Sequence, residues 1–458
     1  MSAFLLALLH AFVSAILVYF IVVNTAQLLL LGAAALEMTR HVRRIRREGR
    51  SRILGSTLAP RITVLAPVCD AEASVTGEVR GLLALYYPNL EIIVINDGSS
   101  DGTLGRLRET FDLVPVHNIF RRVLEAQPVV GQFRSRAHAN LVVVDKHQGG
   151  TADALNAGLN IATGDLVCAI DAGTLVEPDA LQHMVRPFLA SHDLLAAGGP
   201  IRIVNDSTIE RGRVLDVRAP RNALAAFQAV EYLRAFLFAR IGWNRVGGNL
   251  IIAGAFGLFR RAAVLAAGGY RHDVLGEDVE LIVRMRHTAL EQKAPHEVYF
   301  VPDAVAWARA PESAGVLRRQ RERWHRAISS TLWRHRRMLL NPRHGAVGML
   351  VVPWFALVEI AAPLLEAIGL LGLVLGLAVG ALDGTFALFY FVGVYGLAMV
   401  GSMLAVVLEE YSFHRYDTVR DRLILVVAAV LEHVGYRQFT VWARLRSLWT
   451  EPDQPDRS

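Results

Sequence analysis

The alternation of apolar and polar stretches divides the chain into two hydrophobic ends and a more polar middle. The first apolar run extends from Phe4 to Leu36, and a second apolar region begins near Gly345. A helix over the first run would be about 50 Å long, whereas the hydrocarbon core of a bilayer is about 30 Å thick. The pattern therefore predicts one tilted membrane span, in which Asn24 and its polar neighbours face protein or lipid headgroups.

Arginines follow the first apolar run closely. The stretch RHVRRIRREGRSR extends from Arg40 to Arg52, and an excess of basic residues beside a span marks its cytoplasmic side. We therefore expect a protein of the cell inner (plasma) membrane, with the N-terminus outside and the middle of the chain in the cytoplasm. A solvated charged helix is the alternative interpretation of this stretch.

Prolines interrupt the second apolar region at Pro353 and Pro363. The region is too long for one span, so we expect an interfacial helix up to about Val358, a span to Leu382 and a returning span over Phe386–Leu408. The chain is thus predicted to cross the membrane several times.

Acidic residues occur within this membrane-associated sequence. Intramembrane acids usually face a polar cavity, so we place Glu359 and Glu366 on a polar path between the helices. A last apolar stretch, Leu423–Tyr436, also contains Glu432. A spanning and a re-entrant arrangement are equally compatible with that stretch.

Four apolar runs in the middle of the chain each end in a polar residue. The runs are RITVLAPVCD, LEIIVIND, NLVVVDK and GDLVCAID, and they end at Asp70, Asp97, Lys146 and Asp171. Apolar runs that alternate with helical patterns predict an α/β fold, in which helices cover both faces of a parallel sheet. Ligands of such sheets bind beyond the carboxyl ends of the strands, so these four residues are candidates for one binding site.

Glycine-rich turns follow two of these strands and let a ligand approach the backbone. Gly98, Gly149 and Gly150 expose N–H groups that suit phosphate oxygens. Lys146 is one of only two lysines in the chain, and its place beside the Gly-Gly turn indicates a need for a compact ammonium group. An exposed loop lysine is the alternative.

Composition narrows the functional classes. Hydrophobic residues make up 53% of the chain, mean hydropathy is +0.35, and the net charge is +6. Arginine clusters beside apolar segments suit anionic lipid headgroups. The sequence contains no zinc-finger spacing, no GxGxxG after the first strand and no GxxxxGK[ST], so we expect neither nucleic-acid binding nor dinucleotide or P-loop chemistry. Cys69 and Cys168 are expected to be reduced thiols.

Two later stretches add candidate residues. In GNLIIAGAFG, Gly254 has no side chain, so a ligand can lie directly against the backbone there. In GED, Glu277 and Asp278 begin an amphipathic helix. A packed strand turn is the alternative for the glycine. Ordinary partners of the helix dipole are the alternative for the two acids.

The stretch LRRQRERWHRA adds three more candidates. Gln320, Arg323 and Trp324 share one face of the predicted helix, because Arg323 and Trp324 follow Gln320 by three and four positions. A guanidinium fork suits a diphosphate, and an indole suits the C–H bonds of a sugar ring. A juxtamembrane basic helix is the alternative.

Together, the motifs NDGSSD, KHQGG, GED and QRERW resemble those of the family 2 processive glycosyltransferases. This group includes cellulose, hyaluronan, poly-N-acetylglucosamine and chitin-oligosaccharide synthases, and the resemblance covers nearly the whole chain. It implies a cytoplasmic GT-A (Rossmann-like) domain, a UDP-sugar donor, a growing polysaccharide acceptor, and membrane helices that export a β-linked product of inverting transfer. Non-processive transfer of one sugar to a lipid acceptor is the alternative.

The resemblance also assigns roles to the candidate residues. Asp278 would be the general base, with Glu277 beside it, and Trp324 and Gly254 would contact the acceptor. Asp97 would hold the uridine end of the donor. The residues expected to bind the UDP-sugar are Asp70, Asp97, Lys146, Asp171, Gln320 and Arg323.

One motif departs from the family pattern. The family has Asp-x-Asp, whereas this chain has Asp171-Ala172-Gly173. The second carboxylate of that motif normally binds Mg²⁺ or Mn²⁺. Because magnesium takes only one or two protein carboxylates together with substrate phosphates, we expect Asp171 to contact the metal or the nucleotide with weakened metal affinity. A catalytically degenerate, synthase-like protein is the alternative.

The expected organisation has six parts: an N-terminal transmembrane helix (1–38), a basic cytoplasmic linker (39–60), a GT-A catalytic domain (61–310), the QxxRW segment with interfacial helices (311–358), C-terminal transmembrane helices (359–445) and a tail (446–458).

Overall fold

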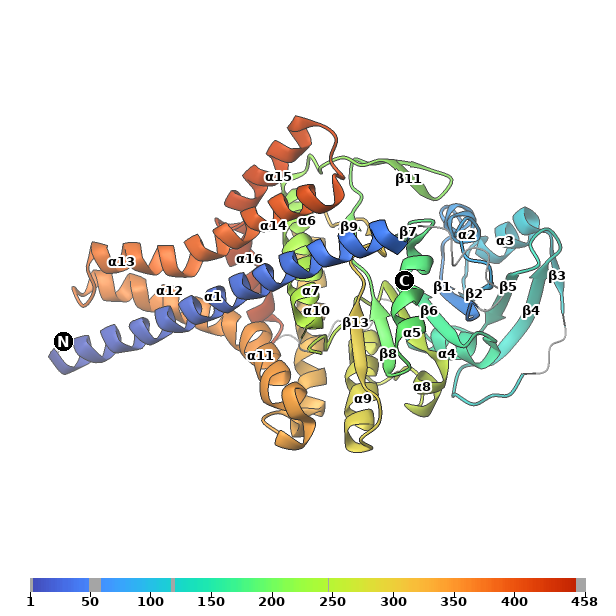
Figure 1. The fold of residues 1–458 in the computed structure, drawn as a ribbon, viewed down its shortest axis with the longest axis horizontal. Helices are drawn as coiled ribbons and strands as arrows, with labels where there is room; N and C mark the ends of the chain where they lie inside the picture. Colours follow the sequence, from blue (N-terminus) through green and yellow to red (C-terminus); the bar gives the residue numbers. More distant parts are fainter. Residues whose placement is uncertain (1–2, 49–58, 117–119, 246, 450–458) are drawn as a thin grey trace.

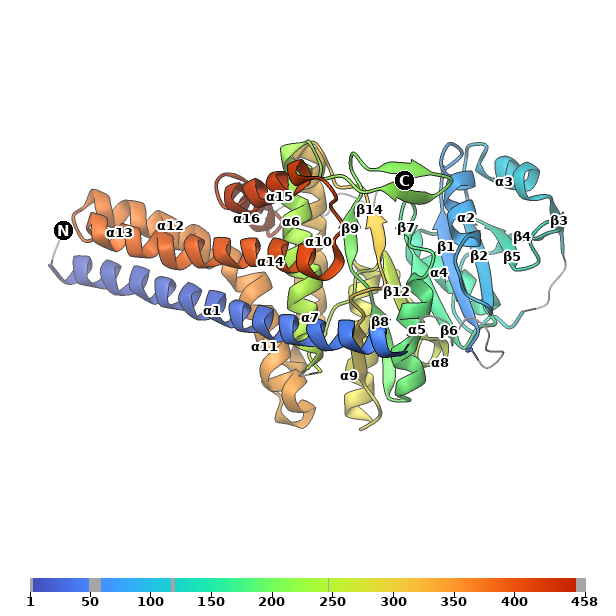
Figure 2. The same cartoon turned by 45° about the horizontal axis from the view of Figure 1, so that its top comes forward.

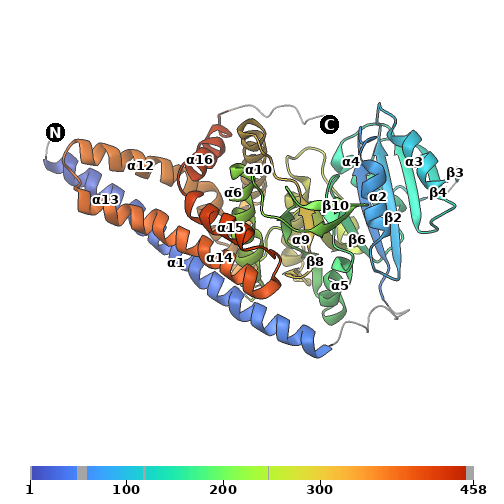
Figure 3. The same cartoon turned by 90° about the horizontal axis from the view of Figure 1, so that it is seen from above.

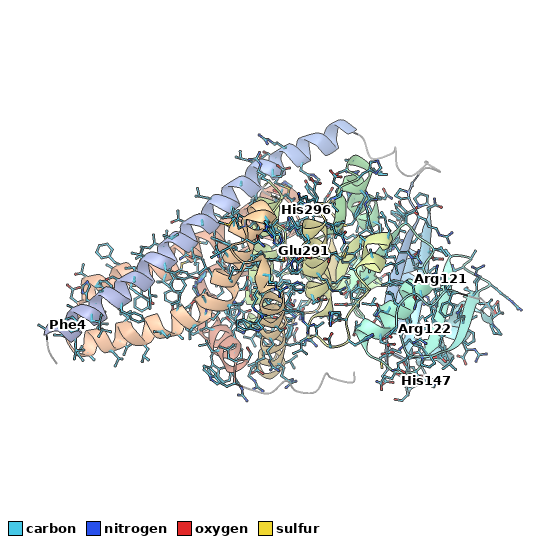
Figure 4. The ribbon with its side chains drawn as sticks, turned by 90° about the horizontal axis from the view of Figure 1, so that it is seen from below. Phe4, Arg121, Arg122, His147, Glu291 and His296 are labelled. Carbon is cyan, nitrogen blue, oxygen red and sulfur yellow. The ribbon has the colours of Figure 1, made fainter. Side chains whose placement is uncertain are left out.

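A computed structural model describes residues 3–48, 59–116, 120–245 and 247–449. The molecule is elongated, with long helices at one end and an α/β domain at the other (Figure 1). Phe4 and His147 lie near these opposite ends (Figure 4). The tail beyond residue 449 and residues 49–58 of the expected basic linker lie outside the described residues.

The α/β domain is built on a mixed sheet of nine strands in the order β13-β8-β12-β6-β1-β2-β5-β4-β3. Its four central strands are parallel, as predicted: β6 (Leu166–Ile170), β1 (Ile62–Val68), β2 (Leu90–Asp97) and β5 (Leu141–Lys146). Every residue of β2 is buried, because helices cover both faces of a central parallel strand.

The outer strands make the sheet mixed, which the apolar runs did not predict. On one side β12 (Phe256–Arg260) is antiparallel to β6 and to β8 (Leu194–Gly198), and β13 (Glu297–Phe300) is parallel to β8. On the other side β4 (Val129–Ser135) is antiparallel to β5 and to β3 (Leu113–Pro115).

Side chains alternate between two helical layers along each central strand. Ile92 and Val94 of β2 pack in the cluster that contains α2 (Val75–Leu83), α3 (Thr103–Phe111) and α5 (Ala180–Ala190). Ile93 and Ile95 pack in the cluster on the other face. The helices of that cluster are α4 (Thr151–Ile161), α8 (Arg261–Ala266) and α9 (Glu277–Glu291).

Two helical columns lie between the sheet and the long helices (Figure 3). One column contains α6 (Ala223–Tyr232), the π-helical η1 (Leu233–Phe238) and α7 (Ala239–Asn244), and the other is α10 (Ala314–Arg334). Small sheets pack beside them: β7 (Leu175–Val176), β14 (Ala306–Ala308) and β9 (Ile201–Ile203) form one, and β10 (Thr208–Glu210) and β11 (Arg213–Asp216) form a hairpin.

Among the residues that the structure describes, three helices are long and apolar enough to cross a membrane: Ala3–His41, Val347–Ala378 and Gly384–Phe413. The first belongs to α1 (Ala3–Glu48), which runs beside the others (Figure 2). Asn24 in α1 donates hydrogen bonds to the carbonyl oxygens of Gly393 (2.9 Å) and Val394 (3.1 Å). Asn24 therefore faces protein, which confirms that prediction.

The helix Val347–Ala378 continues through both prolines of its sequence. It contains two π-helical turns, η4 (Val347–Val351) before Pro353 and η5 (Ala356–Ala361) before Pro363. A proline removes one N–H group and its ring clashes with the carbonyl four residues earlier, and a π turn accommodates both effects. As a result α11 (Val352–Phe355) points in a different direction from α12 (Ala362–Ala378) in Figure 1.

The remaining helices complete the C-terminal half. A tight turn at Asp383 leads into α13 (Gly384–Phe391), η6 (Val392–Gly396) and α14 (Leu397–Phe413). The helices α15 (Val419–Leu431) and α16 (Tyr436–Arg446) meet at an angle of 58°, as in a broken span or a re-entrant loop. Two short 3₁₀ helices, η2 (Arg336–Met338) and η3 (Pro342–His344), follow α10.

Two ion pairs, one buried and one partly buried, join the α/β domain to α14 and to the loop that follows it. The guanidinium of Arg202 in β9 pairs with the carboxylate of Glu409 in α14, and neither side chain is more than 3% exposed. Arg415 donates two hydrogen bonds to Glu177, at 2.7 and 2.9 Å. These contacts hold the domain against the membrane-associated helices.

Candidate active site

The carboxyl ends of the four parallel strands meet at one edge of the sheet. Since β6, β1, β2 and β5 are successive neighbours, the residues that end or follow them lie along this edge. The structure thus brings together the four sequence candidates Asp171, Asp70, Asp97 and Lys146.

Asp97 and Lys146 stabilise the turn that contains Gly149 and Gly150. The carboxylate of Asp97 accepts hydrogen bonds from the N–H groups of Gly149 (3.0 Å) and Gly150 (2.7 Å). The ammonium of Lys146 is fully buried, pairs with Asp97, and lies 2.6 Å from the carboxylate of Asp153. In this arrangement Lys146 stabilises the turn. The expectation that Gly149 and Gly150 expose their N–H groups to a phosphate is wrong, because the carboxylate of Asp97 accepts hydrogen bonds from both.

The neighbouring loops are tied together closely. Gly98 has a φ of +65°, and a Cβ atom there would lie 2.5 Å from the backbone nitrogen of Gln148. Asp70 accepts a hydrogen bond of 2.7 Å from the N–H of Ser100. The turns after β1, β2 and β5 are therefore joined to one another.

Gly254 and Asp278 complete the edge beside Asp171. Phe256 at the start of β12 pairs with Ile170 at the end of β6, which brings the preceding Gly254 near Asp171. A Cβ atom on Gly254 would lie 2.2 Å from the carboxylate of Asp278, and the N–H of Gly254 donates a hydrogen bond to that carboxylate. Only glycine allows this close contact.

Three carboxyl groups at this edge have raised pKa values. Burial, reinforced by the negative charge of Asp278, raises the pKa of Asp171 to about 6, and Arg323 opposes that increase. Although many protein atoms surround the Asp171 carboxyl group, its side chain is exposed to solvent, so a ligand can reach it. Burial and the charges of Asp278 and Asp171 raise the pKa of Glu277 to about 7, and burial also raises the pKa of Asp278.

The three candidates of the QRERW stretch all lie on α10, as predicted. Arg323 is exposed, and its charge acts on Asp171 and Glu277 across the site. Gln320 and Trp324 are half-buried. The structure therefore brings Arg323 to the acidic edge, while the neighbouring Trp324 lines a cavity on the side of the long helices.

That cavity, of about 340 Å³, lies between α10 and the long helices. Glu359 and Glu366 both line it, which agrees with the expectation that they face a polar space. Arginines on α16 pair with them: Arg437 donates to Glu366 at 2.8 Å, and Arg444 lies 3.7 Å from Glu359. The wall of the cavity thus combines aromatic side chains with paired charges.

The described residues contain no group of three or more His, Cys, Asp or Glu side chains arranged around a metal ion. At Gly173, with a φ of +75°, no atom lies within 4 Å of the position that a Cβ would occupy. The exposed carboxylate of Asp171 lies close to this position in the chain. One carboxylate with open space beside it fits a cation that takes its other ligands from a diphosphate and water.

Several residues of the site were not singled out by the sequence patterns. They are Asp153, which shares Lys146 with Asp97, and Glu231, Arg321 and Tyr436, which form one hydrogen-bonded group whose Arg321 lies over the ring of Trp324. The one available signal was Glu231, a single acid in the apolar helix ALAAFQAVEY. Such an acid needs a buried partner, and the partner was not apparent from spacing.

The sheet and the acids at its edge define a GT-A domain attached to membrane-type helices. Residues 60–327 match the family model described as "Glycosyltransferase like family 2". The chain therefore belongs to this family, which confirms the resemblance drawn from its motifs.

Individual relatives agree with this assignment. The chain is 28% identical over 264 residues to the poly-β-1,6-N-acetyl-D-glucosamine synthase of Staphylococcus aureus (strain COL), covering 57% of this chain and 53% of the relative. The synthase of Staphylococcus epidermidis is 26% identical over 276 residues, covering 59% and 56%. The chain spans about half the length of these relatives.

A solved structure has the same fold. It is a mannosyltransferase from Pyrobaculum calidifontis in complex with GDP-Man and Mn²⁺, with a TM-score of 0.51 and 18% identity, covering 92% of this chain and 99% of that one. At this level of identity the likeness concerns the fold.

Proposed function

We propose that this protein is a membrane-bound inverting glycosyltransferase that polymerises a UDP-sugar into a β-linked polysaccharide and exports the product. The observation that carries the proposal is the position of α10. On this helix Arg323 faces the acidic edge of the sheet, and the adjacent Trp324 lines the cavity between the long helices. A sugar added at the acidic edge would thus lie at the entrance of a polar path out of the domain.

The chemistry would be a direct displacement at the anomeric carbon of the donor. Asp278 would accept the proton of the attacking acceptor hydroxyl, and its raised pKa makes it a stronger base than an ordinary carboxylate. Arg323 would meet the negative charge that develops on the leaving diphosphate. A Mg²⁺ or Mn²⁺ ion held by Asp171 would supply further positive charge there.

The relatives suggest which donor to test first. The two relatives described above are poly-β-1,6-N-acetyl-D-glucosamine synthases, so UDP-N-acetylglucosamine is the first candidate and UDP-glucose the second. The two donors differ at one ring substituent, and the acceptor would be the growing chain itself.

The same arrangement supports an orientation in the inner (plasma) membrane. The beginning of α1 and the turn between α12 and α13 lie at the end of the helices farthest from the catalytic domain (Figure 1). At the other end, Trp333 is 72% exposed with the guanidinium of Arg336 5.2 Å from its ring centre. Aromatic side chains are typical of membrane interfaces and basic side chains of the cytoplasmic one, which supports a cytoplasmic catalytic domain with the N-terminus outside.

Purified protein incubated with several UDP-sugars, with and without Mn²⁺, tests the proposal. We expect UDP release together with a polymer or long oligomer. A product consisting of a singly glycosylated lipid would instead identify a non-processive transferase. Binding of UDP-sugar without any release of UDP would identify a catalytically degenerate protein.

Gly173→Asp should restore the second carboxylate of the metal motif. Aspartate tolerates a positive φ better than most residues, and the space beside Gly173 is open. We expect the Mn²⁺ concentration for half-maximal UDP release to fall about tenfold, because metal affinity rises with the number of charged ligands. Ala172→Asp adds the same charge one residue earlier and is the control. An equal response of both variants would argue against a metal role for position 173.

The pH dependence of catalysis should reflect the raised carboxyl pKa values. Since Asp278 must lose its proton and Glu277 has a pKa of about 7, we expect kcat/KM to increase up to about pH 7 rather than to level off near pH 5. Arg323 lowers the pKa of Glu277, so Arg323→Gln should move this increase to higher pH. Arg319→Gln, at an exposed position of the same helix, is the control and should leave the pH dependence unchanged. If Arg323→Gln also left it unchanged, the assignment of the increase to these carboxyl groups would be contradicted.

A further inference from the structure

Trp324 is held between two side chains. The guanidinium of Arg321 lies 4.8 Å from the centre of its ring, and the ring of Tyr232 lies 6.2 Å away at an angle of 37°. A cation over an indole face is attracted by the ring quadrupole, and the attraction increases when water is excluded. Arg321 therefore influences which way the exposed part of Trp324 faces.

Arg321 is itself held by two other helices. It donates two parallel hydrogen bonds to Glu231 of α6, at 2.9 and 2.8 Å. The hydroxyl of Tyr436, the first residue of α16, donates to Glu231 at 2.6 Å and accepts from Arg321 at 3.3 Å. The ring of Tyr436 also packs 5.3 Å from that of Phe227 in α6. Three helices thus meet at one buried group of polar side chains.

The members of this group pair with one another and leave little surface for a ligand, although the Nε of Arg321 is buried without a hydrogen-bond partner. The Arg321 side chain is 3% exposed and Tyr436 is 7% exposed. Although burial alone would raise the pKa of Glu231, Arg321 holds it below its ordinary value, so the carboxylate stays charged. A bidentate guanidinium–carboxylate pair also fixes direction as well as distance.

We propose that Arg321, Glu231 and Tyr436 form a positioning network that orients Trp324 toward the acceptor sugar and makes this orientation depend on α16. The inference rests on the proposed function, because it assumes that Trp324 meets a sugar chain. In this proposal α16 controls the orientation of Trp324, in addition to any role in the membrane. A shift of α16 at the bend before Tyr436 would be transmitted through one hydroxyl to the acceptor site.

Two variants test the network in the purified full-length protein. Tyr436→Phe removes one hydroxyl and keeps the ring. The double variant Arg321→Met with Glu231→Leu removes both charges together, since removing one alone would leave the other buried and unpaired. The readouts are binding of a β-linked N-acetylglucosamine oligosaccharide by calorimetry, KM for the UDP-sugar, and product length.

We expect the dissociation constant for the oligosaccharide to rise roughly tenfold and the products to become shorter, with KM for the donor unchanged. Arg321→Lys keeps a cation near the indole and should recover part of the binding. Arg319→Met, at an exposed position of α10, and Tyr411→Phe, at a side chain that is 70% exposed, are the matched controls.

Each outcome decides the inference. Unchanged oligosaccharide binding and product length in both variants would overturn it, as would an equal loss of donor and oligosaccharide binding, which would indicate general damage. If the wild type binds the oligosaccharide but releases no UDP, the proposed function is wrong. The oligosaccharide affinities of the variants then still test the network. If the wild type binds no oligosaccharide, there is no acceptor to orient and the network inference is wrong.

Discussion

Asp278→Asn should reduce the rate of sugar transfer by about 10²- to 10⁴-fold, the usual contribution of a positioned general base. Asparagine occupies nearly the same space beside Gly254 but accepts no proton. Binding of UDP should stay near the wild-type value, because Asp278 is assigned to the acceptor hydroxyl and not to the nucleotide. Single-turnover transfer and UDP calorimetry measure the two effects separately, and loss of both together would contradict the assigned role.

The same variant should make the protein more stable. The pKa values of Asp278 and Glu277 are raised by burial, so the folded protein binds these protons more tightly than the unfolded chain does. Their ionisation therefore costs stability as pH rises from the ordinary carboxyl range of about 4 through the raised values. We expect Asp278→Asn to raise the Tm at pH 8, with the gain disappearing near pH 4.

A nearby carboxylate provides a control with the opposite sign. A hydrogen bond from Arg271 lowers the pKa of Asp273 to about 2, and the Asp273 side chain is 55% exposed. Asp273→Asn should leave transfer unchanged and should not raise the Tm. If Asp278→Asn lowered the Tm instead, its loss of activity would be structural and would not identify a base.

Arg202→Met should destabilise the protein by about 3–5 kcal/mol, because it leaves the buried carboxylate of Glu409 without its partner. The pair connects β9 with α14, so we also expect the catalytic domain to separate from the long helices before the sheet unfolds. The free energy of unfolding in detergent micelles, followed by domain-specific proteolysis, measures both effects.

The double variant Arg202→Met with Glu409→Leu distinguishes the pair from its individual charges. Replacing both members by apolar residues of similar size is often close to neutral, so most of the stability should return. The exposed pair of Arg218 and Asp216, which are 46% and 41% exposed, is the control, and Arg218→Met should change the stability by no more than about 1 kcal/mol. A double variant as unstable as Arg202→Met would show that packing, and not the unpaired charge, causes the loss.

The central strands and their terminal residues were predictable from the sequence. Each run, such as the one that ends at Asp97, combines a long apolar stretch with an abrupt polar end, and a strand covered on both faces produces this pattern. Because parallel neighbours end at the same edge, convergence of Asp70, Asp97, Lys146 and Asp171 followed from the type of sheet alone. The length and hydropathy of α1 similarly predicted a helix long enough to span a membrane.

The pairing of distant residues was not predictable in this way. The antiparallel placement of β12 between β6 and β8 brings Gly254 beside Asp278, and no local pattern specifies which strand will be a neighbour. Lys146 was expected near the donor, but the structure adds a second carboxylate, Asp153, that holds its ammonium beneath the turn. The proposal that Lys146 contacts the donor directly remains untested.

The sequence by itself determined the local character of this chain: where it is apolar enough for membrane helices, where strands end in acids, and which family its motifs resemble. Periodicity and hydropathy report the surroundings that each residue requires, and those requirements are local. Only the tertiary structure decided the partners. Glu231, Arg321 and Tyr436 are separated by 90 and 115 residues, and they meet because three helices pack together, a result of the whole chain minimising exposed apolar surface and unpaired buried charge.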